Sequence, residues 1–142
     1  MVVKDILNKK GRDVITIHEK ETLHDVINVL VENKFGSLVV MNDKGKMVGI
    51  ITERDILIQS YRHFDHLKSM LVKDAMTRNP IIGLETDSVE TIMKFMSEKK
   101  IRHLPIMRDN SLIGIISMTD IMRNMINESE TEIRYLHEYI TQ

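Results

Sequence analysis

Cysteine is absent from the 142-residue chain, which excludes disulfides, thiolate nucleophiles and cysteine-ligated metal ions. Tryptophan is also absent and only 4% of the residues are aromatic, whereas methionine occurs eleven times; this composition predicts an aliphatic, adaptable core. No apolar run approaches the roughly 18 residues of a membrane span, and no secretory signal follows Met1. We therefore expect a cytoplasmic protein that has no contact with membranes.

A strong charge of either sign is missing as well. Twenty basic residues stand against 21 acidic ones, which argues against a general nucleic-acid-binding protein but leaves room for a local basic pocket. The short basic run from Lys9 to Arg12 is most simply a solvated turn. His63 and His66 lack further ligands at a metal-binding spacing, so no metal site is predicted.

Catalytic motifs are missing too. The chain contains neither of the familiar glycine-rich phosphate loops, and no nucleophile, base and orienting group form a recognisable set. We therefore predict no catalytic residues and expect a protein that is not an enzyme.

The chain instead contains an internal repeat. The phrase Gly-Ile-Ile-[Ser/Thr]-x-x-Asp occurs at residues 49–55 and again at residues 114–120, and similar Val-Lys-Asp openings occur at Val3 and Val72. Length differences between the copies are concentrated in turns, as two copies of one fold would accumulate them.

Each copy reads as β-α-β-β-α. The β stretches at residues 13–17 and 80–84 are each followed by a helix, with Thr22 and either Asp87 or Ser88 as N-caps. A hairpin and a second helix, which begins at Thr52 or Ser117, complete each copy. Since about 60 residues bury an apolar helix face poorly, we expect the copies to pack sheet against sheet in one α+β body.

The predicted organisation has four parts. Residues 1–58 form repeat 1, residues 59–71 connect the repeats as a helix end and loop, and residues 72–127 form repeat 2. Residues 128–142 form a C-terminal helix whose apolar side needs a covering surface, either on its own core or on a second subunit.

The two copies resemble a tandem pair of CBS domains, named after cystathionine beta-synthase and often called a Bateman module. The residues that carry the resemblance are the Val-x-Asp openings, residues 34–40 and 100–106, and the two Gly-Ile-Ile phrases. It extends from about Val2 to Asn127, so the chain looks like a free-standing CBS-pair protein. The resemblance implies a pseudo-two-fold pair that commonly dimerises into a disc of four CBS domains.

The resemblance also implies a ligand and the residues that bind it. CBS pairs commonly bind AMP, ADP, ATP or NAD in clefts between the repeats, as regulatory ligands and not as catalytic cofactors. By position, the ribose hydroxyls would be held by Asp55 with Thr52, and by Asp120 with Ser117 and Thr119. Adenine would lie beside Val14 and Ile15, or beside Pro80 and Ile81. The phosphates would meet the residues that open the middle strand, which are Arg102 and His103 in copy two.

The two predicted clefts differ in charge. Copy two opens its middle strand with Arg102 and His103, whereas copy one opens the equivalent strand with the uncharged Gly36 and Ser37. The positive charge of copy one is instead Arg54, in the first turn of a helix whose N-terminus could itself bind phosphate. We expect the copy-two cleft to bind phosphate more readily, and a single ligand shared between the halves is also open.

Both carboxylates have a simpler interpretation. A hydroxyl N-cap followed three residues later by an acid is close to a capping box, which stabilises a helix without any ligand. The leading hypothesis is a homodimeric adenine-nucleotide sensor that signals energy or redox state to a separate, unidentified protein. The alternative is a ligand-free interaction module that recruits a partner through its dimer surface or its C-terminal helix.

Overall fold

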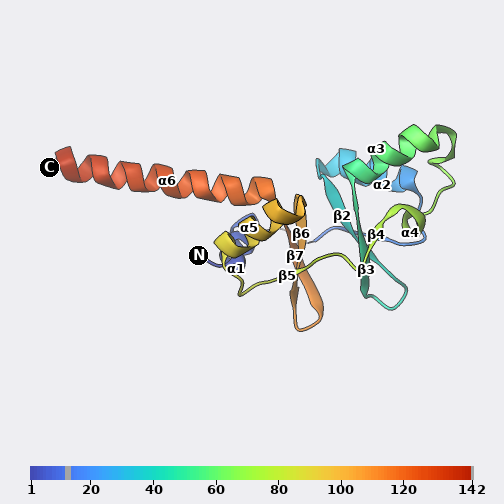
Figure 1. The fold of residues 1–142 in the computed structure, drawn as a ribbon, viewed down its shortest axis with the longest axis horizontal. Helices are drawn as coiled ribbons and strands as arrows, with labels where there is room; N and C mark the ends of the chain where they lie inside the picture. The colour runs from blue at the N-terminus through green and yellow to red at the C-terminus, as the bar shows by residue number, and fades with distance from the viewer. Residues whose placement is uncertain (12–13, 142) are drawn as a thin grey trace.

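The computed structural model, which describes residues 1–11 and 14–141, contains two α+β lobes side by side and one long helix that extends away from them (Figure 1). Each lobe holds one of the two sequence repeats around its own small sheet. The predicted α+β fold of two repeats is therefore confirmed.

The first lobe contains a four-stranded sheet in the order β1-β2-β3-β4. β1 runs parallel to β2 because α2 carries the chain across the sheet, and β2 and β3 form an antiparallel hairpin. The elements that residues 16–66 contribute are β1 (Thr16–His18), α2 (Leu23–Asn33), β2 (Ser37–Met41), β3 (Met47–Thr52), α3 (Glu53–Arg62) and the 3₁₀ turn η1 (Phe64–His66).

The second lobe repeats this arrangement with a three-stranded sheet in the order β5-β6-β7. β5 is parallel to β6, and β6 and β7 form the hairpin, in which His103 pairs with Ser117 just as Ser37 pairs with Thr52 in the first lobe. Its elements are β5 (Gly83–Leu84), α5 (Val89–Lys99), β6 (His103–Arg108), β7 (Ser111–Ser117) and α6 (Met118–Thr141).

Side chains at the helix starts explain where these helices begin. The Thr22 hydroxyl accepts a hydrogen bond from the backbone N–H of Asp25 at 3.2 Å, and the Asp25 carboxylate accepts one from the N–H of Thr22 at 3.0 Å. Ser88 caps α5 by accepting from the N–H of Thr91 at 3.0 Å. Of the residues offered as N-caps, Thr22 is therefore confirmed, and Ser88 takes the role that was open between it and Asp87.

The opening segment of the chain belongs to the second lobe. Helix α1 (Val3–Lys10) buries Val3 and Ile6 in the same core cluster as Met96 and Leu104. The backbone N–H of Val3 donates to the carbonyl of Asp87 at 2.9 Å. Gly114 lies so close to α1 that a Cβ atom there would come within 2.6 Å of the Leu7 side chain.

The segment between the repeats belongs to the first lobe in the same way. Helix α4 (Val72–Ala75) buries Val72 completely, in a cluster with Leu23 and Ile51. Strand β4 (Thr77–Arg78) then pairs antiparallel with β3. The opening segment of repeat 1 thus packs on the second lobe, and the opening segment of repeat 2 packs on the first lobe. The chain therefore passes from one lobe to the other after each opening segment and links the lobes covalently at both places.

Some predicted boundaries differ in the structure. The strands predicted at residues 13–17 and 80–84 are shorter, because strand pairing begins only at Thr16 and Gly83; Asp13 lies outside the described residues. The terminal helix does not begin near Ser129: the second helix of repeat 2 continues without interruption from Met118 to Thr141.

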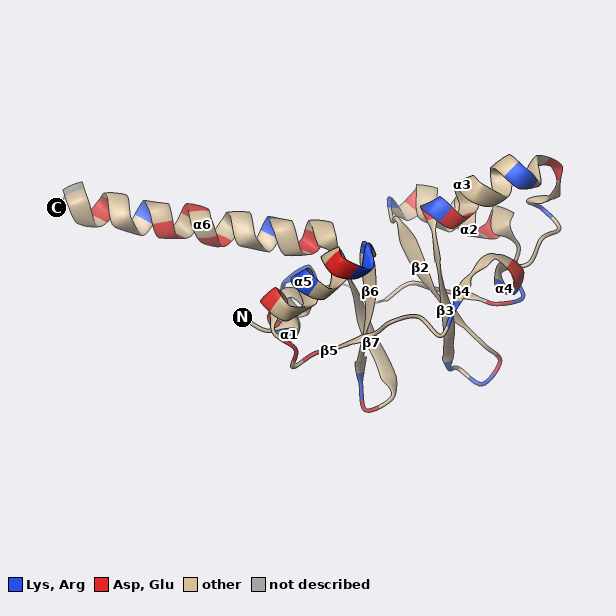
Figure 2. Ribbon diagram, in the orientation of Figure 1, with Lys and Arg blue, Asp and Glu red and all other residues tan. Residues whose placement is uncertain are grey.

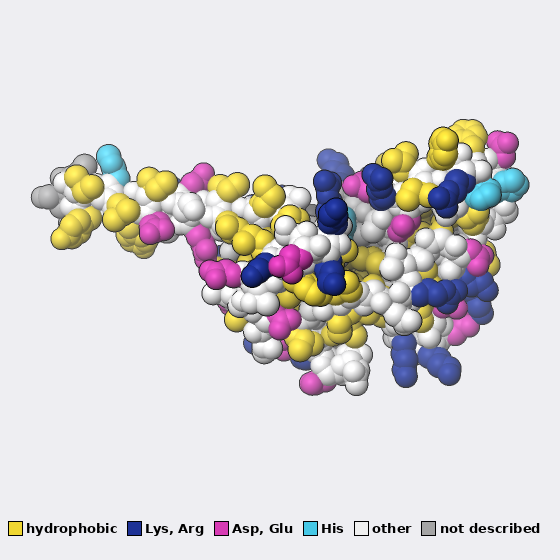
Figure 3. All heavy atoms as spheres, viewed as in Figure 1, with side chains coloured by type: hydrophobic (Ala, Val, Ile, Leu, Met, Phe, Trp, Pro, Cys, Tyr) yellow, Lys and Arg dark blue, Asp and Glu magenta, His cyan; other side chains and the backbone are white. Residues whose placement is uncertain are grey.

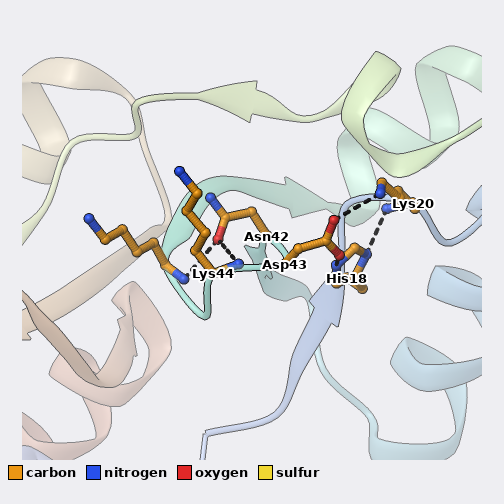
Figure 4. Close-up of polar contacts among 6 residues, drawn as sticks. His18, Lys20, Asn42, Asp43 and Lys44 are labelled. Atoms are coloured by element: carbon orange, nitrogen blue, oxygen red, sulfur yellow. Dashed lines mark hydrogen bonds and ion pairs between the residues drawn. The ribbon is translucent and has the colours of Figure 1, made fainter.

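The hairpin turn of the first lobe is held by exposed polar contacts. The Asp43 carboxylate lies 2.8 Å from both His18 Nε2 and Lys20 Nζ (Figure 4). The Asn42 side-chain oxygen accepts from the backbone N–H groups of Lys44 and Lys46. Hydrogen bonding from Lys20 lowers the pKa of Asp43, but these groups are exposed and the contacts serve to shape the turn.

Gly49 and Gly114 occupy equivalent positions in the two hairpins, but we expect their substitution by alanine to destabilise the fold to different extents. A Cβ at Gly49 would lie 2.7 Å from the backbone oxygen of Thr77 and 2.6 Å from Met76 Sδ, so Gly49→Ala must displace β4 and should cost about 1–3 kcal/mol of unfolding free energy. At Gly114 the three atoms nearest to the new methyl all belong to the Leu7 side chain, which can rotate. Gly114→Ala is therefore the matched control, and urea unfolding should show a smaller loss of unfolding free energy for it than for Gly49→Ala. An equal or larger loss for Gly114→Ala would show that α1 is held as rigidly as β4.

Candidate functional site

A cavity of about 930 Å³ lies where the two lobes meet. Its volume is within the range of small-molecule sites. Residues of both repeats line it, from α1, the segment before β1, the α2–β2 connection, β7 and the start of α6. Of the residues predicted to bind a ligand, seven line this one cavity: Val14, Ile15, Ser37, His103, Ser117, Thr119 and Asp120.

Asp120 is the most constrained acidic group of the cavity. Its Oδ2 atom accepts hydrogen bonds from the backbone N–H of Ser117 at 2.9 Å and from Lys10 Nζ at 2.8 Å. The Ser117 hydroxyl in turn accepts from the N–H of Asp120 at 3.1 Å, which completes a reciprocal cap at the start of α6. Within residues 1–11 and 14–141, every hydrogen bond to this carboxylate goes to Oδ2, so Oδ1 can accept from a ligand.

The ion pair of Asp120 with Lys10 links the start of α6 to the end of α1, which lie far apart in the sequence. Lys10 reaches the site from the last residue of α1, and its ammonium also donates to the carbonyl of Ile115 at 2.9 Å. Only 11% of the Asp120 side chain and 31% of the Lys10 side chain are exposed. Partial burial by itself raises the pKa of Asp120, but hydrogen bonds from Lys10 and Ser117 outweigh it, so the pKa lies below its ordinary value. Asp120 is therefore an anion at neutral pH.

His103 opens β6 and pairs in the sheet with Ser117, the residue that caps Asp120. A Cβ atom at Gly36 would lie 3.0 Å from its Nε2, so the absence of a side chain at Gly36 lets the imidazole pack against the first lobe. Burial lowers the pKa of His103, and the charges of Glu53 and Asp120 offset this only in part. The imidazole is accordingly neutral at pH 7 and can gain a proton when an anion arrives.

Among the described residues, basic side chains outnumber acidic ones around the cavity. Four described cationic side chains line it against two described carboxylates: Lys9, Lys10, Lys34 and Arg123 against Glu53 and Asp120. Lys and Arg positions lie at the ends of α2 and α5, just before β2 and β6, on the side where the lobes meet (Figure 2). Basic side chains gather in the same region of the surface (Figure 3). The cavity is therefore suited to an anionic ligand.

Lys34 occupies its place at some conformational cost. It is the C-cap of α2 in the left-handed conformation with φ 56°, where glycine is the usual residue. Lys100 ends α5 in the same way, with φ 56°. Both repeats end this helix with a left-handed lysine, and of the two Lys34 lines the cavity whereas Lys100 is not among its lining residues.

The other predicted ligand residues do not line this cavity. Asp55 and Thr52 form a reciprocal cap at the start of α3, with bonds of 2.9 and 3.2 Å, and Arg54 is exposed on the first turn of that helix. Arg102 is exposed before β6, and Pro80 and Ile81 lie between β4 and β5. The copy-two site thus has its carboxylate from copy two, whereas Val14 and Ile15, which precede β1, come from copy one.

Sequence reasoning missed the lysines of the cavity. The basic run at residues 9–12 was interpreted as a solvated turn, whereas Lys10 is paired with Asp120; Arg12 lies outside the described residues. Nothing in the spacing could have revealed this pair, since 110 residues separate its members. Among the described residues, no group of three or more histidines and acids is placed to hold a metal ion.

Solved structures of CBS-domain proteins are similar to this chain, and two of them illustrate the match. A CBS-domain-containing protein, ATU1752 from Agrobacterium tumefaciens, matches with 31% identity and a TM-score of 0.82, over 86% of this chain and 91% of that one. The CBS domain pair of protein MJ0100, solved in complex with 5′-methylthioadenosine and S-adenosyl-L-methionine, matches with 28% identity and a TM-score of 0.78, over 90% of this chain and 98% of that one.

The sequence comparisons agree with the structural ones. Protein MK0525 of Methanopyrus kandleri is 40% identical over 114 residues, which is 79% of this chain and 58% of that protein. The chain therefore spans little more than half the length of this relative. Residues 3–61 and 72–127 each match the sequence model of the CBS domain. The chain belongs to the CBS domain family and carries two copies of the domain.

Proposed function

We propose that the cavity binds an adenine nucleotide and that the protein is a non-catalytic regulatory module. The observation that carries the proposal is Asp120, an ionised, mostly buried carboxylate whose Oδ1 faces no donor among the described residues, on the wall of a cavity of about 930 Å³. A carboxylate oxygen can accept hydrogen bonds from the two adjacent hydroxyls of a ribose. The ligands of the MJ0100 domain pair both contain adenosine-type riboses, which supports this assignment.

The lining residues can be assigned to the parts of such a ligand. Asp120 would hold the ribose hydroxyls, with Ser117 and Thr119 beside it. Val14, Ile15 and Ile113 offer an apolar wall for the base, and the lysines at positions 10 and 34, Arg123 and His103 would meet the phosphates. The assignment to Val14 and Ile15 leaves Pro80 and Ile81 without a role in this cavity.

Charge favours a phosphorylated ligand over a sulfonium compound. S-adenosyl-L-methionine carries a positive sulfur, and here it would face two more cationic than acidic side chains among the described residues that line the cavity. AMP, ADP, ATP and NAD bring negative phosphates instead. We therefore infer that this chain differs from the MJ0100 pair in ligand and prefers AMP, ATP or NAD.

Regulation follows if the nucleotide changes how the lobes or subunits pack. Both lobes line the cavity, so a bound ligand would bridge them, and a separate protein could respond to the change. We propose that the module acts as a homodimer in this role. A second nucleotide site around Asp55, Thr52 and Arg54 in copy one remains a prediction.

A ligand-free interaction module is the second candidate function. One observation favours it: the carboxylate of Asp120 already has a structural role through its cap to Ser117 and its ion pair with Lys10. In that case the cavity has no regulatory ligand, and a partner is recruited through the surface or through α6. The two candidates differ in whether any nucleotide stabilises the fold.

Nucleotide binding predicts a thermal shift that depends on Asp120. A ligand at 100 times its dissociation constant adds about 2.7 kcal/mol to the stability of the folded state. AMP, ADP, ATP or NAD at millimolar concentration should therefore raise the melting temperature by several degrees, adenosine should raise it less, and Asp120→Asn should abolish most of the shift.

Asp55→Asn is the matched control for this experiment. Asp55 makes the same reciprocal cap with Thr52 that Asp120 makes with Ser117, but it does not line the cavity. Both variants should melt lower without ligand, and only Asp55→Asn should keep the nucleotide shift. If none of the nucleotides shifts the wild-type protein, or if Asp120→Asn binds as well as wild type, the cavity is not the proposed site.

Phosphate binding next to His103 predicts a pH-dependent affinity. Burial holds the pKa of His103 below 6.5 in the free protein, and an anionic ligand raises it, so binding takes up a proton. Nucleotide affinity should therefore increase as the pH falls from the pKa of His103 in the complex towards its lower pKa in the free protein. Calorimetry on wild type and His103→Gln side by side removes the contribution of the ligand's own titration. The advantage of wild type should be larger below pH 6.5 than above it; an advantage that is independent of pH contradicts phosphate contact by His103.

A further inference from the structure

The distal part of α6 buries none of its described side chains. Near its start the helix contacts the second lobe, where Ile121 is fully buried and Asn124 is 6% exposed. All described side chains from Met125 to Ile140 are exposed. Figure 1 shows this part of the helix extending well beyond both lobes. No helix within the described residues is long and apolar enough to cross a membrane.

The exposed face of this helix carries a regular apolar seam. Hydrophobic side chains are visible along its free length (Figure 3). Its apolar residues and one serine follow each other at intervals of four, three, four, three and four, which is a heptad pattern. The seam consists of Met122, Ile126, Ser129, Ile133, Leu136 and Ile140, and its five apolar members are 55% to 79% exposed.

The seam points to another helix of the same kind as its partner. Within the seam isoleucine occupies the a positions 126, 133 and 140, while the d positions hold Met122, Ser129 and Leu136. β-branched residues at a with leucine at d, as at Leu136, favour parallel two-stranded coiled coils. We propose that α6 forms a parallel coiled coil with α6 of a second copy of this chain.

Charges beside the seam favour the parallel orientation. In a parallel pair the g residue Glu132 faces the e residue His137 of the second copy, and Glu130 faces Met125. In an antiparallel pair that aligns the same a and d layers, Glu130 and Glu132 would each face their own counterparts, and like charges repel. The free part of the helix has four glutamates and one arginine, Arg134, so an anionic membrane surface is a poor partner.

The coiled coil is joined directly to the cavity. Thr119, Asp120 and Arg123 line the cavity from the first turns of the same helix that carries the seam. Pairing in parallel therefore places the cavities of two copies at the same end of the coil. This interface is built from α6 alone and does not depend on a nucleotide being bound, so its test is independent of the proposed function.

The absence of cysteine makes disulfide cross-linking a clean test. With helix axes 8–10 Å apart, facing a positions in a parallel pair approach within the range of a disulfide. Ile126→Cys and Ile140→Cys, each made alone in the full chain, should form covalent dimers under mild oxidation. Thr131→Cys, at an f position on the opposite face, should remain monomeric on a non-reducing gel.

Other outcomes overturn the proposal. In an antiparallel pair Ile126 would lie roughly 15 Å from its counterpart, so neither seam cysteine would link to itself. Equal linking by Thr131→Cys would show random collision, and no linking by any of the three would show that this face is covered by something else.

A charge in the seam provides a second, independent measurement. Ile133→Glu buries an unpaired charge in the proposed interface, whereas Tyr135→Glu places the same group at the outward c position. Ile133→Glu should suppress cross-linking of the Ile126→Cys protein and raise its dimer dissociation constant at least about tenfold, which corresponds to 1.4 kcal/mol. Tyr135→Glu should change neither. Because Ile133 is exposed and lies outside both hydrophobic cores, unchanged urea unfolding of the two lobes serves as the folding control. Unchanged cross-linking in Ile133→Glu contradicts the coiled coil.

Discussion

The exchange of opening segments between the repeats is the constraint on which the rest of the structure depends. Helix α1 completes the core of the second lobe, and α4 with β4 completes the first, so neither lobe is finished by its own stretch of chain. Burial of Val3, Ile6 and Val72 drives this exchange, since each fully buried aliphatic side chain contributes about 1.5–3 kcal/mol. The same crossing brings Lys10, at the end of α1, to the carboxylate of Asp120.

The composite cavity is a consequence of that topology. Because α1 lies on the second lobe while the chain that follows it returns to the first, residues 14 and 15 pass the site on their way to β1. The site therefore combines a carboxylate from copy two, a lysine from the start of the chain and an apolar wall from copy one. Residues of both halves line the cavity, as a single ligand shared between the halves would require, and that ligand stays a prediction.

The fold could be predicted because its signals are local and occur twice. Heptad-like apolar spacing, hydroxyl caps at Thr22 and Ser88 and turn residues in the hairpins each act over a few residues, and their repetition excludes coincidence. The exchange of segments could not be predicted, since Val3 and Val72 have similar surroundings in sequence and either core would accept them. Asp120 could be identified from its local cap, but its partner Lys10 could not, because contacts between distant segments leave no local signal in the sequence.

Asp55 and Asp120 show that the local sequence does not determine which of two similar acids lines the cavity. Asp55 and Asp120 have the same sequence context and the same reciprocal cap, with backbone bonds of 2.9 Å in both. They differ because α1 places an ammonium beside Asp120 and the arrangement of the lobes leaves a cavity in front of it. A carboxylate that only capped a helix would gain little from a buried ion pair, whose desolvation commonly offsets its Coulombic attraction. Under the proposed function Lys10 has a further role: it keeps Asp120 ionised, and the surroundings positive, in a site that would receive an anionic ligand with ribose hydroxyls.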